Sequence, residues 1–281
     1  MIRASLLAAT LWGVAAAGAA AQVDTTARDT TRAARDTTRA ADTLPVLLPT
    51  FAAPIRAGPL PAGTRYTFTT DSLLFTNART LSDLLNHIPG VYVARGGWYG
   101  QAEVVLYGGR GPAGLEIFWD GFPYLPLGRD SVYVDPARIP LAPLERVDVV
   151  VLPAVLEVYL VTAQPRSTTP TTQVGILTGD QNIAGYRAGY SSRARSGLGI
   201  ALVADWNSLD GANTTTDFAS SDLWAKVEYA PPGGRVGASF QISTAGWHRE
   251  PDADGLVDDW RQVRQDRLLR FFLASRDDGL G

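Results

Sequence analysis

The residue types that usually carry catalysis are scarce in this chain. It has two histidines, His87 and His248, which lie in unrelated sequence contexts, and it has no cysteine. The sequence also lacks a Gly-x-Ser-x-Gly nucleophile elbow, so it offers no nucleophilic triad. Without cysteine there is no cysteine-based zinc site, disulfide framework or iron–sulfur cluster. We expect no enzymatic activity, no metal site and no cofactor.

Three other groupings of polar residues or glycines have structural explanations. The alternating carboxylates at 252–259 resemble half of a calcium loop, but no bidentate Glu stands at the required place, which favours a solvated loop. The glycine-rich stretch at 108–111 is not followed by a P-loop lysine, so it is not expected to cradle phosphate. Glu145 and Arg146 form an ion pair within their domain or against a neighbouring wall, or they are an exposed pair of little energetic consequence.

The charge balance argues against nucleic acid as a partner. The 281 residues include 25 basic and 28 acidic side chains, for a net charge of −3, whereas phosphate binding needs a basic field. Lys226 is the sole lysine, so nearly all positive charge comes from arginine.

The N-terminus predicts export. Arg3 precedes an uncharged, alanine-rich apolar stretch that ends in a small-x-small cleavage site, typical of a signal peptide at residues 1–21. A membrane anchor is the alternative. Residues 22–41 repeat a short Asp/Thr/Arg/Ala phrase with almost no large apolar residue, which predicts a disordered tether, or alternatively a short amphiphilic helix.

An apolar extended segment at 42–48 follows this tether and precedes a Pro/Gly-rich linker at 49–63. Pro45 disfavours a helix and biases the residue before it toward extended geometry. A short apolar strand on a flexible tether suits pairing with the sheet edge of a partner protein. Packing on the neighbouring domain explains the same residues equally well. The segment consists of Asp42, Thr43, Leu44, Pro45, Val46, Leu47 and Leu48.

Residues 65–162 predict a compact α+β domain with a small mixed sheet. Thr80 and Asp83 mark the N-terminus of a helix, which Pro89 and Gly90 end. Strands are expected at 66–69, 91–93, 103–107, 115–119, 146–151 and 156–161, separated by glycine-containing turns.

From residue 172 onward, apolar residues alternate strictly with small, polar or charged ones. The pattern recurs at 184–190, 198–207, 223–229, 236–243 and 267–275. One face is apolar and ends in aromatic residues, while the other carries Arg187, Lys226 and Glu228. This is typical of antiparallel transmembrane β-barrel strands, with lipid outside and a wet lumen inside. A soluble antiparallel sandwich also alternates, but its strands need not reach the ~9–10 residues of a tilted membrane span.

Four segments resemble the plug domain of TonB-dependent outer-membrane receptors, in the order and near the spacing of that family. They are the helix end at 80–91, the strand end at 104–108, the Asp-Gly turn at 117–123 and the strand at 140–149. The residues that carry the resemblance are Leu84, Leu85, Pro89, Gly90, Val91, Tyr107, Gly108, Arg110, Asp120, Gly121, Glu145 and Arg146.

The resemblance implies a domain order and a function. It implies a plug domain at 64–165 that fills a barrel beginning at 172–281, set in outer-membrane lipid with the tether in the periplasm. Residues 42–48 are similar to the TonB box, the segment that a TonB-like energy-transducing protein binds. Pulling on it would remodel the plug and release a bound small-molecule ligand inward, such as a metal chelate, cobalamin or glycan.

Three departures from the family pattern leave an alternative open. The family arginine near the second segment falls on Tyr107 by spacing, or on Arg110. The glycines of the plug's last motif are missing from 151–162. About 22 strands are needed to surround a plug, whereas residues 172–281 supply about six to eight, which favours a truncated chain. The alternative is a periplasmic or surface binding protein that reuses a plug-like domain without transport.

Overall fold

The computed structural model describes residues 64–76, 78–96, 100–126, 133–180, 182–210, 217–231, 236–249 and 260–273. These residues all belong to one compact unit, Pro45–Gly281. The expected signal peptide, tether, TonB-box-like segment and linker at 1–63 lie outside the described residues, as does the carboxylate-rich stretch at 252–259. No helix among the described residues is long and apolar enough to cross a membrane.

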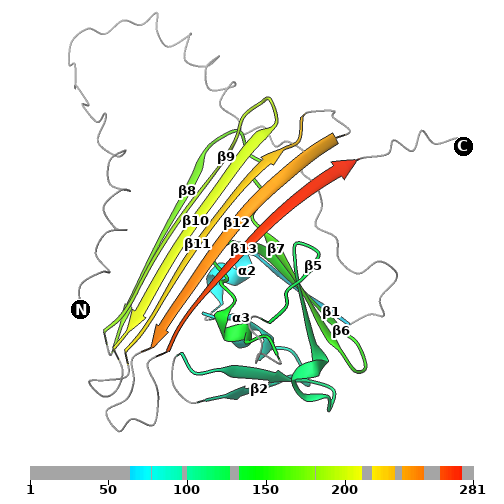
Figure 1. Cartoon of the computed structure of the whole chain (residues 1–281), viewed down its shortest axis with the longest axis vertical. Helices are drawn as coiled ribbons and strands as arrows, with labels where there is room; N and C mark the ends of the chain where they lie inside the picture. The colour runs from blue at the N-terminus through cyan, green and yellow to red at the C-terminus, as the bar shows by residue number, and fades with distance from the viewer. Residues whose placement is uncertain are drawn as a thin grey trace, which may run out of the picture. The chain divides into compact units, whose positions relative to one another are not determined.

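The first half of the described chain forms an α/β domain (Figure 1). Its main sheet has the order β1-β6-β7-β4-β5, and within that sheet the β4–β7 pair is parallel while the other pairs are antiparallel. The separate hairpin of β2 and β3 is antiparallel. The strands are β1 (Arg65–Thr69), β2 (Tyr92–Arg95), β3 (Glu103–Leu106), β4 (Leu115–Trp119), β5 (Phe122–Pro123), β6 (Leu144–Val151) and β7 (Leu156–Thr162). The mixed sheet expected from the sequence is confirmed.

Two short α-helices and two 3₁₀ turns complete this domain: α2 (Thr70–Phe75), α3 (Leu81–Leu85), η1 (Gly111–Gly114) and η2 (Pro136–Arg138). Thr80 caps α3 as predicted, since its hydroxyl accepts from the amide of Asp83 at 3.2 Å and the Asp83 carboxylate accepts from the amide of Thr80 at 3.1 Å. The helix α2 was not predicted, because it is six residues long, buries no side chain and has no side-chain cap to mark its start.

A single apolar core joins α3 to the sheet. Leu81, Leu84 and Leu85 of α3 are fully buried and belong to one apolar cluster with residues of β4, β6 and β7. The same cluster includes Ala201 and Trp224, which belong to the second half of the chain. The packing therefore continues from the α/β domain onto the sheet that follows it.

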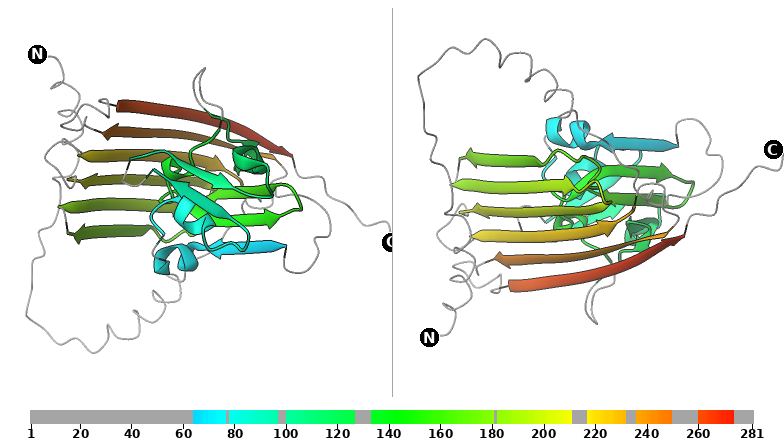
Figure 2. Two further views of the ribbon diagram at one scale, coloured as in Figure 1. Left: turned by 90° about the horizontal axis from the view of Figure 1, so that it is seen from below. Right: turned by 90° about the horizontal axis from the view of Figure 1, so that it is seen from above.

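That second half is a six-stranded antiparallel sheet in the order β13-β12-β11-β10-β9-β8, seen in two further directions in Figure 2. Its strands are β8 (Thr171–Gly179), β9 (Ile183–Arg193), β10 (Leu198–Leu209), β11 (Phe218–Tyr229), β12 (Val236–Arg249) and β13 (Trp260–Leu273). The number agrees with the expected six to eight. β8 precedes the first of the five segments in which the alternation predicts a strand, and β13 begins seven residues before the predicted position, because most residues of its N-terminal half are polar.

The two faces of the six-stranded sheet differ as the alternation predicts. Along β10, Leu198, Ile200 and Leu202 are exposed on the outer face. The intervening Gly199 and Ala201 are buried on the opposite face, which the α/β domain covers. A soluble sandwich would bury the apolar face and leave the polar face wet. Here the arrangement is reversed, so the outer face has the character of a lipid-facing surface.

Candidate functional site

The exposed apolar residues of the outer face run diagonally across the sheet. On β8 they are Val174 and Ile176. Following the strand pairing across the sheet, the row of Val174 reaches Thr244 on β12 and Gln265 on β13. The row of Ile176 reaches Gly246 and Val263 on the same two strands. On β13 the apolar run lies at the other end, residues 269–273. Strands of membrane barrels tilt by roughly 35–45°, so a band parallel to the membrane must cross their rows obliquely. Tyr186 and Trp206 stack at one border of this band, with ring centroids 5.6 Å apart.

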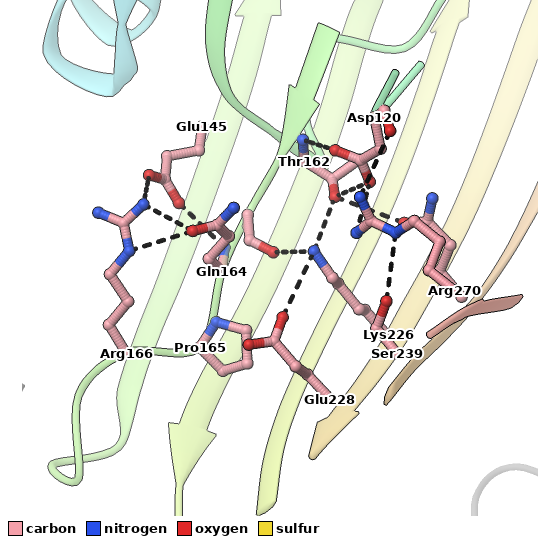
Figure 3. A network of polar contacts seen from close by, with 12 residues as sticks. Asp120, Glu145, Thr162, Gln164, Pro165, Arg166, Lys226, Glu228, Ser239 and Arg270 are labelled. Atoms are coloured by element: carbon pink, nitrogen blue, oxygen red, sulfur yellow. Dashed lines mark hydrogen bonds and ion pairs between the residues drawn. The ribbon is translucent and has the colours of Figure 1, made fainter. Parts of the chain in front are cut away.

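The inner face is where the sheet meets the α/β domain, and Asp120 is one of the residues in that contact (Figure 3). Asp120 and Gly121 join β4 to β5, with φ values of 47° and 89°. Two successive residues with positive φ define a type I′ hairpin turn, for which Asp-Gly is a favoured pair. The turn leaves the Asp120 carboxylate buried, where it accepts from the amide of Thr162 at 3.0 Å and from its hydroxyl at 2.7 Å.

Arg270 reaches this turn from β13. Its Nη2 lies 3.5 Å from Oδ2 of Asp120, and its Nη1 donates to the Asp120 carbonyl oxygen at 3.4 Å. Its Nε donates to the hydroxyl of Ser239 on β12 at 3.3 Å. The guanidinium group therefore connects the turn to two strands of the sheet, and both charged side chains are at least nine-tenths buried.

Lys226 of β11 forms hydrogen bonds with the last residues of the α/β domain. Its Nζ donates to the hydroxyl of Thr162 at 3.2 Å and to the carbonyl oxygen of Ala163 at 3.4 Å. Glu228, two residues along the same strand, lies 4.0 Å away and balances its charge. The Lys226 side chain has no exposed surface. A fully buried cation is costly unless it is paired and hydrogen-bonded, and Lys226 is both.

Arg193 of β9 continues the same network. It donates to the carbonyl oxygens of Pro165 at 3.1 Å and Ala230 at 2.7 Å, and it lies 3.6 Å from Glu228. Residues 162–165, which link the α/β domain to the sheet, thus accept hydrogen bonds from two buried cations of the inner face. Figure 3 shows the contacts of one of them, Lys226.

The structure places the other predicted residues apart from this network. Leu84 and Leu85 are core residues, and Val91 is half-buried. Pro89 and Gly90 are exposed at the end of α3, where Gly90 has a φ of 81°.

Tyr107 is one of the two positions, with Arg110, at which the family resemblance would place an arginine. Its hydroxyl donates to the carbonyl oxygen of Leu152 at 2.8 Å and so joins β3 to the β6–β7 turn. Gly108 and Arg110 lie in the exposed turn that follows.

Glu145 and Arg146 each have an ionic partner, and the two partners differ. Glu145 pairs with Arg166 at 2.7 Å and accepts from the amide of Gln164 at 3.0 Å. Arg146 pairs with the buried carboxylate of Asp148 at 2.8 Å.

Sequence reasoning named Lys226 and Glu228 as members of the polar face but did not single out Arg193 or Arg270. A signal was present, since each of these residues occupies an inward position of an alternating strand. Charged residues are almost never fully buried unless they are paired. Inward charges opposite a packed domain are therefore candidates for cross-domain contacts.

A second contact joins η2 and the loop after β5 to β13. The guanidinium of Arg264 lies 3.5 Å from the centroid of the Tyr124 ring, and its Nη1 donates to the Leu125 carbonyl oxygen at 2.8 Å. Arg138 donates to Gln262 and pairs with Asp135 at 3.0 Å. Burial raises the pKa values of Tyr124 and Asp135 and lowers that of Arg138.

The cavity between these groups measures about 60 Å³. Drug-sized ligands occupy pockets of roughly 300–1,000 Å³, so this gap is too small for a bulky ligand. Within the described residues, no group of three or more His, Cys, Asp and Glu side chains is arranged to hold a metal ion.

Comparison with known proteins identifies the α/β domain. Residues 61–156 match the family model of the TonB-dependent Receptor Plug Domain. No curated protein matches the chain. The match assigns residues 61–156 to the plug-domain family of TonB-dependent receptors.

Solved structures share this fold at low sequence identity. The FrpB iron transporter from Neisseria meningitidis is 11% identical over 74% of this chain and 38% of its own, with a TM-score of 0.59. The siderophore receptor PirA from Acinetobacter baumannii is 16% identical over 74% and 37%, with a TM-score of 0.57. The copper transporter OprC is 15% identical over 69% and 32%, with a TM-score of 0.57. The chain spans less than two fifths of each.

Proposed function

We propose that this chain acts in energy-dependent uptake across the outer membrane. Its plug domain would block the barrel lumen at rest and move when a TonB-like protein pulls on residues 42–48. The observation that carries the proposal is the two-sided sheet, whose outer face has a tilted apolar band and whose inner face holds the plug through buried ionic contacts.

The domain order follows from the same proposal. It comprises a signal peptide at 1–21, a tether at 22–41, a TonB-box-like segment at 42–48, a linker at 49–63, a plug at 64–165 and barrel wall at 172–281. The plug motifs would serve the fold of the plug, while Asp120 would serve its attachment to the wall.

The ligand class that we favour is a metal chelate. Three of the matched structures are named as a siderophore receptor, an iron transporter and a copper transporter. Cobalamin and glycans remain the other classes that the sequence resemblance implies. The comparisons do not favour the alternative of a non-transporting binding protein, because the matched structures are named as receptors and transporters.

The test is photo-crosslinking from a benzophenone amino acid at Leu47, in cells that make a TonB-like protein. Strand pairing needs backbone N–H donors, which proline lacks. We expect Val46→Pro to abolish the crosslink and Thr37→Pro, in the upstream repeat, to leave it intact. Uptake of radiolabelled ferric siderophores should follow the same pattern. A crosslink that survives Val46→Pro would exclude residues 42–48 as the partner-binding strand.

A further inference from the structure

The junction between the plug and the wall carries an unusual concentration of buried charge. Lys226, Arg193, Arg270, Glu228 and Asp120 all have side chains that are at least nine-tenths buried. Four of the five come from the wall, and Asp120 is the carboxylate that the plug supplies. Buried ion pairs are rarely the most stable way to fill a space, but removing one partner is strongly destabilising. The network is therefore suited to holding one seated position of the plug.

The contacts of Lys226 are concentrated on a single structural point. Its Nζ donates to the hydroxyl of Thr162, which in turn donates to Asp120. Its second acceptor is the carbonyl oxygen of Ala163, directly after β7. One amine thus fixes both the last residues of the plug and, through Thr162, the turn between β4 and β5.

We infer that Lys226 is the positioning residue that seats the plug on the wall, so that the plug leaves only when the contacts of its amine with Thr162 and Ala163 break. Asp120 and Glu228 balance the charge from the plug side and the wall side. Arg270 holds the far side of the Asp120 turn, and Arg193 holds the junction at Pro165.

This inference rests on the proposed function for its biological meaning, because it concerns the contact that must break before the plug moves. Its test uses neither a TonB-like partner nor a ligand. The inference can therefore fail while the proposed uptake function stands, and the reverse also holds.

The sequence makes a direct test possible. Lys226 is the sole lysine and the chain has no cysteine. Ala201 pairs directly with Lys226 across β10 and β11 and is buried in the shared core. A cysteine at this position reports whether the plug covers the inner face beside Lys226.

The experiment measures the rate at which a maleimide labels Ala201→Cys in the full chain, held in detergent micelles at a low urea concentration. Breaking coupled buried contacts is expected to speed labelling at least about fivefold in Lys226→Met and in Asp120→Asn. Lys226→Arg keeps the charge and two or more donors. The logarithm of its labelling rate should therefore lie at least halfway back from the Lys226→Met value to that of the parent. Rescue by arginine distinguishes a positioning cation from simple side-chain volume.

The matched control is Asp148→Asn. Asp148 is as deeply buried as Asp120, but its hydrogen bonds are to Arg65, Thr67 and Arg146 within the plug. We expect Asp148→Asn to change the labelling rate less than about twofold at the same urea concentration. Equal acceleration by Asp148→Asn and Asp120→Asn would overturn the inference, because labelling would then report general plug stability.

A second readout needs no substitution. In the unmodified chain, an amine-reactive succinimidyl ester should leave Lys226 intact until urea displaces the plug, as followed by peptide mapping. Acylation of Lys226 at the rate of an exposed lysine in the absence of urea would contradict the inference. So would a Lys226→Met variant whose Ala201→Cys label rate equals that of the parent.

Discussion

At the scale of single residues, the capping aspartate of α3 is the group whose titration should be visible. Burial alone would raise the pKa of Asp83, but hydrogen bonds from the amides of Arg79 and Thr80 and from the Arg95 guanidinium outweigh it, so the pKa is lowered. A lowered native pKa means that the carboxylate stabilises the fold above its ordinary pKa. This contribution is lost as the pH falls through the native value.

The corresponding variant is Asp83→Asn. At pH 7 we expect it to lower the stability of the plug by about 1 kcal/mol, because the cap is weakened. The difference from the parent should shrink as the pH falls below about 4, the ordinary pKa at which Asp83 of the unfolded chain begins to bind a proton, and it should be lost once the pH has passed through the lowered native pKa. Urea midpoints followed by near-UV circular dichroism at several pH values provide the measurement. A difference that stays constant down to acid pH would show that the charge of Asp83 is not involved.

Tyr107, which takes the place of the family arginine if the spacing is followed, offers a second residue-scale prediction. Its hydroxyl donates to the Leu152 carbonyl oxygen. Tyr107→Phe should cost about 1 kcal/mol of plug stability, the usual value of such a bond. Tyr92→Phe is the control, since the Tyr92 side chain is 65% exposed. Equal urea midpoints for both variants would mean that the Tyr107 bond contributes nothing.

At this scale, contacts between residues close in the chain could be predicted from the sequence, and contacts between distant residues could not. The Asp120–Gly121 turn and the Thr80–Asp83 cap were predictable, because each depends on residues that are near neighbours in the chain. The meeting of Arg270 with Asp120 was not, since 150 positions separate them. It depends on how far each strand extends and on the register of five strand pairs.

At the scale of elements, the same contrast recurs in the strands. The alternation in β10 and β11 was strong enough to predict their inner and outer faces. It missed β8, where Thr171 and Thr172 look like a linker, and it missed α2, which has no buried side to create a helical period. An element that buries one face leaves a hydrophobic period in the sequence, and an element that buries neither face leaves no such period.

The outer face of β10 supports an element-scale prediction about lipid. Leu202 lies in the middle of the exposed apolar run from Leu198 to Trp206. Arginine facing the centre of a bilayer costs roughly 2–4 kcal/mol, falling to about 0–1 near the interface. Leu202→Arg should therefore weaken insertion into lipid vesicles strongly, while Ser208→Arg, beyond the apolar run on the same face, should weaken it little.

The measurement is the urea midpoint for release from vesicles, followed by the protease resistance of the sheet. Equal shifts for Leu202→Arg and Ser208→Arg would contradict a lipid-facing band on β10. A strong effect of Ser208→Arg alone would place the centre of the membrane nearer that end of the strand.

At the scale of the whole molecule, the described sheet has two free edges. Its strand order begins at β13 and ends at β8, and neither of these has a second partner among the described residues. A free edge presents unpaired backbone N–H and C=O groups, which are unacceptable in lipid and prone to pair with another chain in water. Membrane β-sheets avoid this by closing into barrels.

The 281-residue chain on its own should therefore self-associate through these edges. In detergent micelles we expect analytical ultracentrifugation to show oligomers, and unboiled samples to lack the compact, heat-modifiable gel band of a closed barrel. Proline at Val174 and at Leu269, one in each edge strand, removes backbone donors and should reduce the association. Proline at Arg195, in the short turn between β9 and β10, is the control and should leave it unchanged. A monomer with a heat-modifiable band would instead mean that β8 and β13 find partners within the chain itself.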